Sequence, residues 1–168
     1  DTALSKLRDL AEKKHLEIVI KKTTPNIVWG NVTALEQIVS NLIKNAINYS
    51  DSGGLITIRI GPDYYGNVLL EVEDTGLGIS KKDLMHIFEP FYRAERSRNR
   101  QTGSSGLGLT IVSELVKMHS GRITIKSAED RGTQVIVTLP YGRHIEESRT
   151  SHTDEISVNF LREDVNNS

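Results

Sequence analysis

The chain has 168 residues, of which 37% are hydrophobic, so it can form one domain with a single core and a tail. Lys and Arg number 21 against 22 Asp and Glu, and this net charge of −1 gives no electrostatic indication of binding to nucleic acids or anionic membranes. Cysteine is absent, which excludes disulfides, and no apolar run approaches the about 20 residues of a membrane helix. We therefore expect a cytoplasmic domain with no nucleic-acid partner. Its start within a helical pattern indicates a piece of a longer protein.

Hydrophobic periodicity and turn residues predict helices and strands along the first 140 residues. In chain order, the predicted elements are a helix over Thr2–Lys14, a strand over Glu17–Lys22, a helix from Asn31 or Thr33 to Tyr49, strands over Leu55–Ile60 and Val68–Glu73, a short helix near Lys81–Ile87, a helix over Leu107–His119, and strands over Arg122–Ser127 and Thr133–Leu139. Asn31 or Thr33 is suited to cap the second helix. Gly121 is placed to end the last helix in a left-handed conformation.

The predicted strands come in hairpins rather than in strict alternation with helices. This order predicts an α/β fold, a two-layer sandwich with a mixed sheet and helices packed on one face, and it disfavours a Rossmann fold. The predicted domain covers residues 1–140. Residues 141–168 are polar and charged with little to bury, which predicts a C-terminal tail, although Ile156, Val158 and Phe160 alternate as in an edge strand.

The most informative segment is the irregular stretch from Asp74 to Ser105, because a connection this long in a compact domain is typical of an active-site lid. Glycine clusters bound it at both ends. The second cluster, residues 103–108, lies directly before a helix, where free backbone N–H groups can hold a phosphate. In the first cluster, Asp74 can accept a hydrogen bond from an amine such as that of adenine. Gly76 and Gly78 would let a flat ring lie close to the backbone. Either cluster alone is also typical of an ordinary turn.

Two asparagines on the second predicted helix form the third signal. Asn41 and Asn45 are four residues apart, so their amides project from one helix face beside the apolar stripe. Amide oxygens are hard ligands of the kind that Mg²⁺ accepts together with phosphates and water. The alternative is that they are ordinary surface or capping asparagines.

Taken together and in order, these motifs resemble those of sensor histidine kinases. The matching segments are the N box at Gln37–Ser50, the first glycine box at Asp74–Ile79, the F box at Ile87–Arg93, the second glycine box at Gly106–Leu109, and the closing motif Gly132-Thr133. The resemblance covers about residues 3–140. It implies the Bergerat ATP-binding sandwich, which type II topoisomerases, mismatch-repair ATPases and large heat-shock chaperones share, with ATP and Mg²⁺ as ligands.

The resemblance also implies roles at the base of the nucleotide. Asp74 would bind the adenine amine, with Thr133 supporting it through water. The adenine pocket would be walled by Tyr49, Ile79 and Leu109, and the glycine boxes would contribute Gly76, Gly78 and Gly106.

At the triphosphate, the resemblance implies that Asn45 ligates Mg²⁺ and that Asn41 lies beside the phosphates, so these two are the candidate catalytic residues. The N–H groups of Leu107 and Gly108 would hold phosphate at the helix start. A long flexible ATP lid would span residues 91–105, with Arg98 and Arg100 as candidate phosphate contacts.

One position departs from the family pattern. The family usually has Lys three residues after the Mg²⁺-binding asparagine, where this chain has Asn48. Lys44 or the lid arginines could supply that charge instead. No histidine has the context of a phospho-acceptor, and His144 resembles one only faintly. The implied partners are therefore the protein's own dimerisation and phospho-acceptor domain, missing from this chain, and a downstream response regulator. The fragment would be a monomer, cut from a homodimeric, membrane-bound sensor kinase.

Two rival functions remain open. Hydrolytic ATPases of the topoisomerase or chaperone type place a Glu four residues before the Mg²⁺-binding asparagine as the base for water. Here that position is Asn41, whose amide cannot take a proton usefully at neutral pH, and the F box favours the kinases. A non-catalytic module that binds nucleotide or only a protein partner is the second rival. The complete F box disfavours a related serine kinase.

Overall fold

The computed structural model describes residues 2–24, 27–94 and 105–142. In chain order, its elements are α1 (Thr2–Lys13), β1 (Glu17–Lys22), α2 (Val32–Tyr49), β2 (Leu55–Pro62), β3 (Val68–Asp74), α3 (Lys81–Leu84), α5 (Gly108–Met118), β4 (Arg122–Ser127) and β5 (Thr133–Leu139). Every predicted element is present. The short helix ends earlier than predicted, because tighter turns with bonds from His86 N to Asp83 O (2.9 Å) and Glu89 N to His86 O (2.8 Å) follow it.

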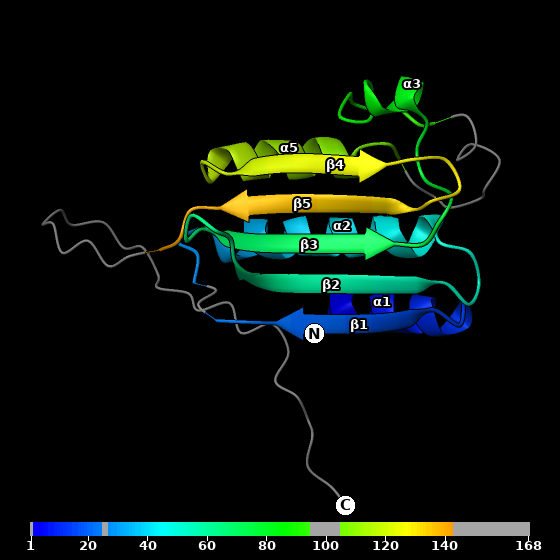
Figure 1. Ribbon diagram of the computed structural model, residues 1–168, viewed down its shortest axis with the longest axis horizontal. Coiled ribbons are helices and arrows are strands. Elements are labelled where there is room, and N and C mark those ends of the chain that lie inside the picture. Colours follow the sequence, from blue (N-terminus) through cyan, green and yellow to red (C-terminus); the bar gives the residue numbers. More distant parts are fainter. Residues whose placement is uncertain (1, 25–26, 95–104, 143–168) are drawn as a thin grey trace, which may run out of the picture.

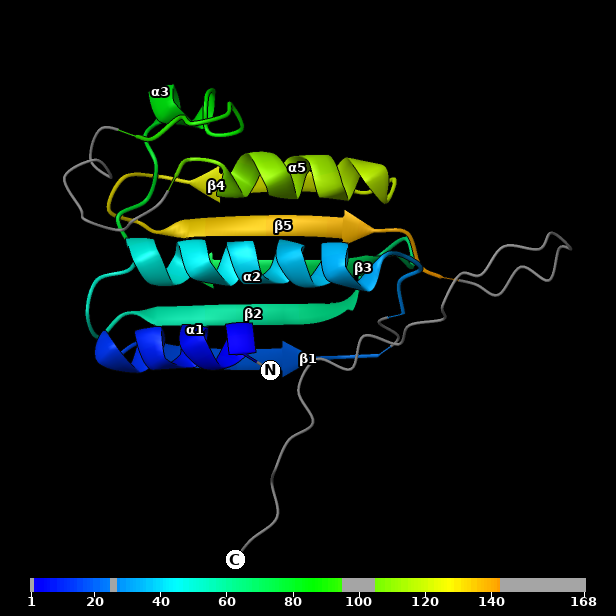
Figure 2. The ribbon, with the colours of Figure 1, turned by 180° about the vertical axis from the view of Figure 1, so that it is seen from behind.

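The five strands form one mixed sheet in the order β1-β2-β3-β5-β4 (Figure 1). β1 runs parallel to β2, and every other neighbouring pair is antiparallel. Figure 2, seen from behind, shows α1, α2 and α5 side by side over one face of this sheet. The prediction of a two-layer sandwich with helices on one face is therefore confirmed.

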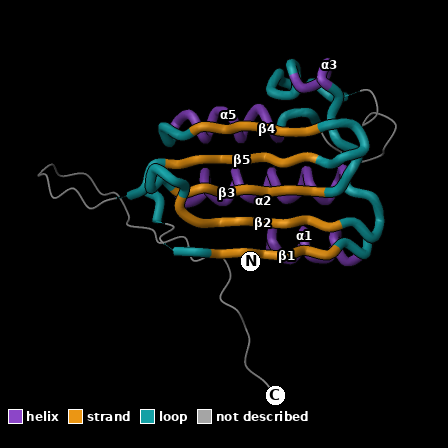
Figure 3. Tube along the Cα trace, in the orientation of Figure 1, coloured by secondary structure: helices purple, strands orange, loops and turns teal. Residues whose placement is uncertain are grey.

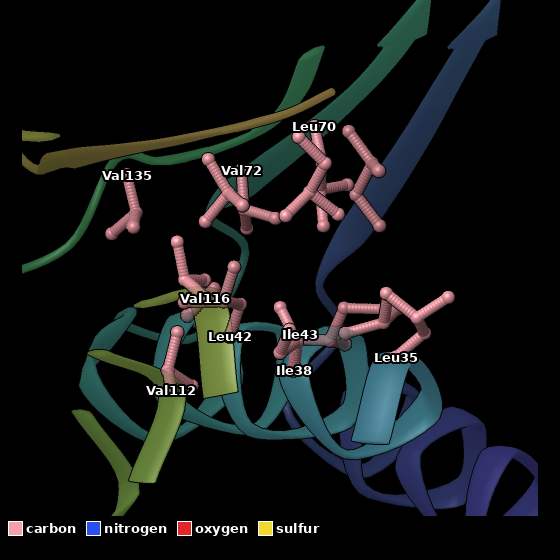
Figure 4. Packing of buried hydrophobic residues seen from close by; sticks show 14 of the residues in the cluster. Leu35, Ile38, Leu42, Ile43, Leu70, Val72, Val112, Val116 and Val135 are labelled. Carbon is pink, nitrogen blue, oxygen red and sulfur yellow. The ribbon is translucent and has the colours of Figure 1, made fainter. Parts of the chain in front are cut away.

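The core lies between that helical layer and the sheet. β3 alternates strictly, with Val68, Leu70 and Val72 buried, because successive strand residues point to opposite faces. Figure 4 shows side chains of α2 and α5 pointing toward these strand residues. Among them Val112 and Val116 of α5 are 0% exposed, so this helix is held firmly against the sheet.

The helix ends test two predictions about caps. Asn31 caps α2 as predicted, since its side-chain oxygen accepts from Ala34 N at 3.0 Å. The prediction that Gly121 ends α5 in a left-handed conformation is wrong. Ser120 takes that conformation, with φ 54°, while the N–H of Gly121 donates to Val116 O at 2.9 Å. Gly121 is required for another reason: a Cβ there would lie 2.6 Å from Leu139 on β5.

The carboxyl end of α2 is capped by a residue from a distant part of the chain. The ammonium of Lys14, in the turn between α1 and β1, donates to the carbonyls of Ile47 (2.7 Å), Asn48 (2.9 Å) and Ser50 (3.1 Å). A cation at this position satisfies orphan carbonyls and complements the helix dipole. Asn48, the departure from the family pattern, is itself only 7% exposed.

Beyond β5, Tyr141 forms an isolated bridge with Val28, and Gly142 N donates to Ile27 O at 3.0 Å. The predicted tail boundary at residue 141 therefore falls beside residues that still contact the domain, and residues 143–168 lie outside the described part. Of the helices described, none combines the length and the apolar character required to span a bilayer.

Candidate functional site

Several segments meet at one end of the sheet (Figure 3), where β3 and β4 end, β5 begins, α2 ends and α5 begins. A cleft opens there, roofed by the connection that carries α3. Its lining consists of Leu42, Asn45, Ala46, Tyr49, Val72, Asp74, Leu77, Gly78, Ile79, Ser80, Asp83, Ile87, Tyr92, Arg93, Ala94, Gly106, Leu109, Ile125, Glu129, Thr133 and Val135.

Asp74 is the buried carboxylate of this cleft. It ends β3 opposite Thr133 of β5 in the antiparallel register and is 8% exposed. Its Oδ1 accepts from Gly76 N at 2.8 Å and from Thr133 N at 3.3 Å. Burial raises the pKa of Asp74 to about 6, although these two bonds oppose the rise. Within the described residues Oδ2 has no hydrogen-bond partner, so it remains available as an acceptor.

The glycines of the first box bring backbone segments together. A Cβ on Gly76 would collide with the carbonyl of Tyr49, and one on Gly78 would collide with the carbonyl of Ala128. Gly78 also has φ 65°, which glycine adopts at no steric cost. The sequence predicts that these glycines let a ligand ring lie close to the backbone. In the structure they allow close contacts between backbone segments of the protein, and these contacts place Asp74 and Ile79 in the cleft.

A single hydroxyl joins the first glycine loop to the last hairpin. Ser127 Oγ accepts from Ile79 N at 2.9 Å and donates to Gly132 O at 2.7 Å. The same oxygen lies 2.9 Å from Thr133 Oγ1. Sequence reasoning missed Ser127, although counting back across the predicted hairpin from Thr133 would have paired the two residues.

The opposite end of the cleft is formed by two helices. A Cβ on Gly108, the first residue of α5, would lie 3.6 Å from Asn45 Oδ1 and 3.8 Å from Asn41 Oδ1, so both amides border the start of α5. No side chain of the described residues caps this helix. Asn41 Nδ2 is buried and has no hydrogen-bond partner among the described residues. A buried donor without a partner costs about 1–3 kcal/mol, which an anionic oxygen would relieve.

The roof of the cleft is held by its own hydrogen bonds. Tyr92 Oη and Ser80 Oγ each donate to the carboxylate of Asp83 at 2.7 Å. The hydrogen bond from Tyr92 is the largest cause, and with that from Ser80 it holds the pKa of Asp83 below its usual value. Thr110 Oγ1 of α5 donates to Phe88 O at 3.0 Å and so ties the F box to the helix that follows.

Most of the predicted site residues converge on this cleft. Eight line it, namely Asn45, Tyr49, Asp74, Gly78, Ile79, Gly106, Leu109 and Thr133. Asn41, Gly76 and Gly108 lie against these residues, and Leu107 precedes the start of α5. Arg98 and Arg100 fall outside the described residues. Sequence reasoning missed Asp83 and Glu129 in the lining, because the elements that bring them there are distant in sequence.

The donor set fits a nucleotide with a magnesium ion. The Nδ2 of Asn41 is a hydrogen-bond donor, suited to a phosphate oxygen and unsuited to a cation. The amide oxygen of Asn45 is a hard ligand acceptable to Mg²⁺. In the described part of the chain no group of three His, Asp or Glu side chains could hold a metal, so a cation here would need ligands from phosphate and water as well.

Comparisons with known proteins identify the family. A family model described as histidine kinase-, DNA gyrase B- and HSP90-like ATPase matches residues 30–143. The chain is 42% identical over 135 residues to the sensor histidine kinase YclK of Bacillus subtilis, covering 80% of this chain and 28% of that protein. It is also 40% identical to the sensor histidine kinase WalK of the same organism, and this match covers 79% of this chain and 22% of WalK. A solved structure of the mycobacterial sensor histidine kinase MprB is similar with a TM-score of 0.72 and 30% identity, covering 83% of this chain and 91% of that one. The chain thus spans less than a third of the curated relatives' length.

Proposed function

Because the chain belongs to the histidine kinase-, DNA gyrase B- and HSP90-like ATPase family and is the ATP-binding catalytic domain of a sensor histidine kinase, we propose that it transfers the γ-phosphoryl group of Mg-ATP to a histidine on a separate dimerisation domain. One observation supports this most: a single cleft is lined by the buried carboxylate of Asp74 at one end and by Asn45 at the other, and Asn45 and Asn41 both border the start of α5. That spacing of acceptor and donor groups suits a base at one end and phosphates at the other.

At the base end, Asp74 accepts a hydrogen bond from the adenine amine through Oδ2, while Ile79, Leu109 and Tyr49 contact the faces of the ring. At the phosphate end, Asn41 donates to a phosphate oxygen and the N–H groups of Leu107 and Gly108 support the charge. Asn45 ligates Mg²⁺, which when bound neutralises charge on the phosphate oxygens.

The proposed reaction depends more on the orientation of the reacting groups than on proton transfer. The imidazole nitrogen of the acceptor histidine forms a bond to the γ-phosphorus, while the bond from that phosphorus to the bridging oxygen breaks and this oxygen leaves as part of ADP. An imidazole needs no strong base, whereas water does. Among the described residues, the carboxylates that line the cleft come from β3, from α3 and from the β4–β5 turn, and α2 carries only the exposed Glu36. This arrangement favours a kinase over a hydrolase.

The partners follow from this reaction. We propose the protein's own dimerisation domain as the phospho-acceptor and a response regulator as the next carrier of the phosphoryl group. In this proposal the isolated chain is monomeric, the parent kinase is a membrane-bound homodimer, and this domain lies in the cytoplasm.

The test is phosphoryl transfer in trans. The chain is mixed with the dimerisation domain of its parent kinase and ATP labelled in the γ-phosphate. We expect acid-labile, base-stable phosphohistidine on that partner, none on this chain, and very slow ATP hydrolysis by the chain alone. An Asn45→Ala variant serves as the control for Mg-dependent transfer. Fast, partner-independent hydrolysis would identify a hydrolytic ATPase, and a failure to bind ATP would identify a non-catalytic module.

A further inference from the structure

The hydroxyl of Ser127 has three neighbours within hydrogen-bond distance but only one proton. Ile79 N at 2.9 Å is a backbone N–H, which can only donate. The carbonyl of Gly132 at 2.7 Å can only accept. A serine oxygen offers one proton and two acceptor lone pairs. Its proton therefore goes to Gly132, and one of its lone pairs goes to Ile79.

These two bonds also determine which partner donates in the third contact. Thr133 Oγ1 lies 2.9 Å from Ser127 Oγ, which has only a lone pair left to offer. Thr133 must therefore donate its own proton to Ser127. In the opposite arrangement Ser127 would donate to Thr133, and two lone pairs would then face each other across the 2.7 Å to Gly132 O. The arrangement with Thr133 as donor is the one that satisfies all three contacts.

This direction determines what the cleft presents to a ligand. Thr133 lines the cleft, and with its proton spent on Ser127 its Oγ1 can only accept. Beside it, Asp74 Oδ2 is also an acceptor while the carboxylate is ionised. The two nearby backbone donors, Gly76 N and Thr133 N, are both bound to Asp74 Oδ1. The two backbone N–H groups that contact Asp74 and the hydroxyl proton of Thr133 are therefore all used within the protein.

We propose that Ser127 is a positioning residue that holds the Thr133 hydroxyl as an acceptor and so makes the cleft select an amino-purine over a keto-purine. This inference rests on the proposed nucleotide site. The exocyclic amine of adenine carries two N–H groups, which two acceptors can receive. The oxygen at the same position of hypoxanthine would face the lone pairs of these two acceptors.

A bridging water would obey the same rule. Water has two protons, and the two acceptors, Asp74 Oδ2 and Thr133 Oγ1, can take both. Such a water turns a lone pair toward the base and again receives an N–H rather than a carbonyl oxygen. At the exocyclic position of the base, the preference for an amine therefore holds whether Thr133 acts directly or through one water.

The experiment compares the dissociation constants of ATP and ITP, whose base carries the keto oxygen, by calorimetry on the whole chain. We expect the parent to prefer ATP, and Ser127→Ala to reduce the ITP/ATP ratio of dissociation constants about tenfold, because the freed Thr133 hydroxyl can rotate and donate to the keto oxygen. Ser127→Thr keeps the hydroxyl and should keep the ratio. Thr124→Ala, which removes an exposed hydroxyl from the same strand, is the matched control.

A purely structural role for Ser127 predicts a different result. Losing the bond to Ile79 N would weaken ATP and ITP equally, leaving the ratio unchanged, and that outcome would overturn the inference. In a Thr133→Val background the hydroxyl is absent, so adding Ser127→Ala should not alter the ratio further. If Ser127→Ala does not fold, Thr133→Val alone should still lower the ratio, and an unchanged ratio there would also overturn the inference. If the parent protein binds neither ATP nor ITP, the proposed function itself is contradicted.

Discussion

The two ends of the cleft are built in opposite ways. At the base end, hydrogen bonds within the protein link Asp74 to Thr133 and Thr133 to Ser127, and they leave Asp74 Oδ2 as an acceptor. At the phosphate end, α5 starts without a side-chain cap, and Asn41 Nδ2 is buried without a partner among the described residues.

This difference separates recognition that exists before binding from recognition that the ligand completes. The base end is organised by sheet register and backbone contacts, so it costs little to hold in place when a nucleotide arrives. The phosphate end holds donors whose hydrogen bonds a ligand would supply. Changes at the base end should therefore alter which nucleotide binds, and changes at the phosphate end should alter how much the phosphates and Mg²⁺ add to binding.

The largest loss of ATP affinity is expected for Asp74→Asn, which tests the base end. The amide oxygen keeps the bonds from Gly76 and Thr133, while its NH₂ group faces the cleft where an acceptor is needed. We expect ATP affinity to fall at least about 100-fold, measured by calorimetry, because a donor then faces the adenine amine. The empty domain should gain about 1–3 kcal/mol in denaturant unfolding at neutral pH, since a carboxylate with its pKa raised to about 6 is destabilising when ionised.

A matched control for that variant is Asp63→Asn in the β2–β3 turn. Hydrogen bonds from the Asn67 side chain and from backbone N–H groups lower the pKa of Asp63, so its ionised form stabilises the fold. This substitution should reduce stability and leave ATP affinity unchanged. If both Asp→Asn variants shift stability in the same direction, the assignment of opposite environments is wrong.

The second prediction concerns pH. Because the ionised form of Asp74 is the acceptor, affinity for adenosine, which has no phosphate to titrate, should fall about tenfold for each pH unit below about 6. The empty domain should behave oppositely: its folded state holds the proton more tightly than the unfolded chain, so this contribution to stability falls as pH rises from about 4 through 6. Adenosine affinity that is constant between pH 5 and pH 7 would contradict the role of the carboxylate.

The third prediction concerns the phosphate end. Asn45→Ala should remove most of the gain in ATP affinity that Mg²⁺ provides, about tenfold, because the amide oxygen is the proposed protein ligand. Adenosine affinity should not change, since the base end is intact. Titrations with and without magnesium measure both. A variant that still gains affinity from magnesium as the parent does would place the ion elsewhere.

The smallest effect is expected at Lys14, which contacts neither end. Lys14→Met removes the donor to three carbonyls at the end of α2, so stability should fall by about 1–2 kcal/mol in denaturant unfolding. ATP affinity should fall only about threefold, through movement of Tyr49 at the end of that helix. Lys14→Arg is the conservative comparison. A loss of affinity as large as that of Asp74→Asn would mean that the two ends are not independent.

Much of the fold could be predicted, because the strands alternate cleanly and the helices carry apolar stripes. The misassigned helix end shows what local patterns miss. Gly121 was expected to supply a left-handed residue, but Ser120 does, and Gly121 is needed because β5 passes too close for a Cβ. Contacts that depend on distant segments, such as Lys14 with the end of α2, leave no local signal.

The site divides in the same way. Asp74, Asn45 and Gly108 were found because a motif surrounds each one. Ser127 belongs to none of the family motifs named above. Its proposed role depends on hydrogen bonds to Ile79 and Thr133 that form only when the sheet folds. Sequence motifs therefore predict which groups contact a ligand, and the structure adds the residue that we propose sets the direction of one of their hydrogen bonds.

The cap that Lys14 places on α2 bears on where this domain begins. The family model matches from residue 30 onward, and a fragment cut there would retain every motif. It would lose β1, the parallel edge strand, and would expose the carbonyls that Lys14 covers. We therefore expect the segment that folds as a stable unit to be longer than the matched segment, and N-terminal truncation should cause loss of stability once Lys14 is removed, before residue 30 is reached.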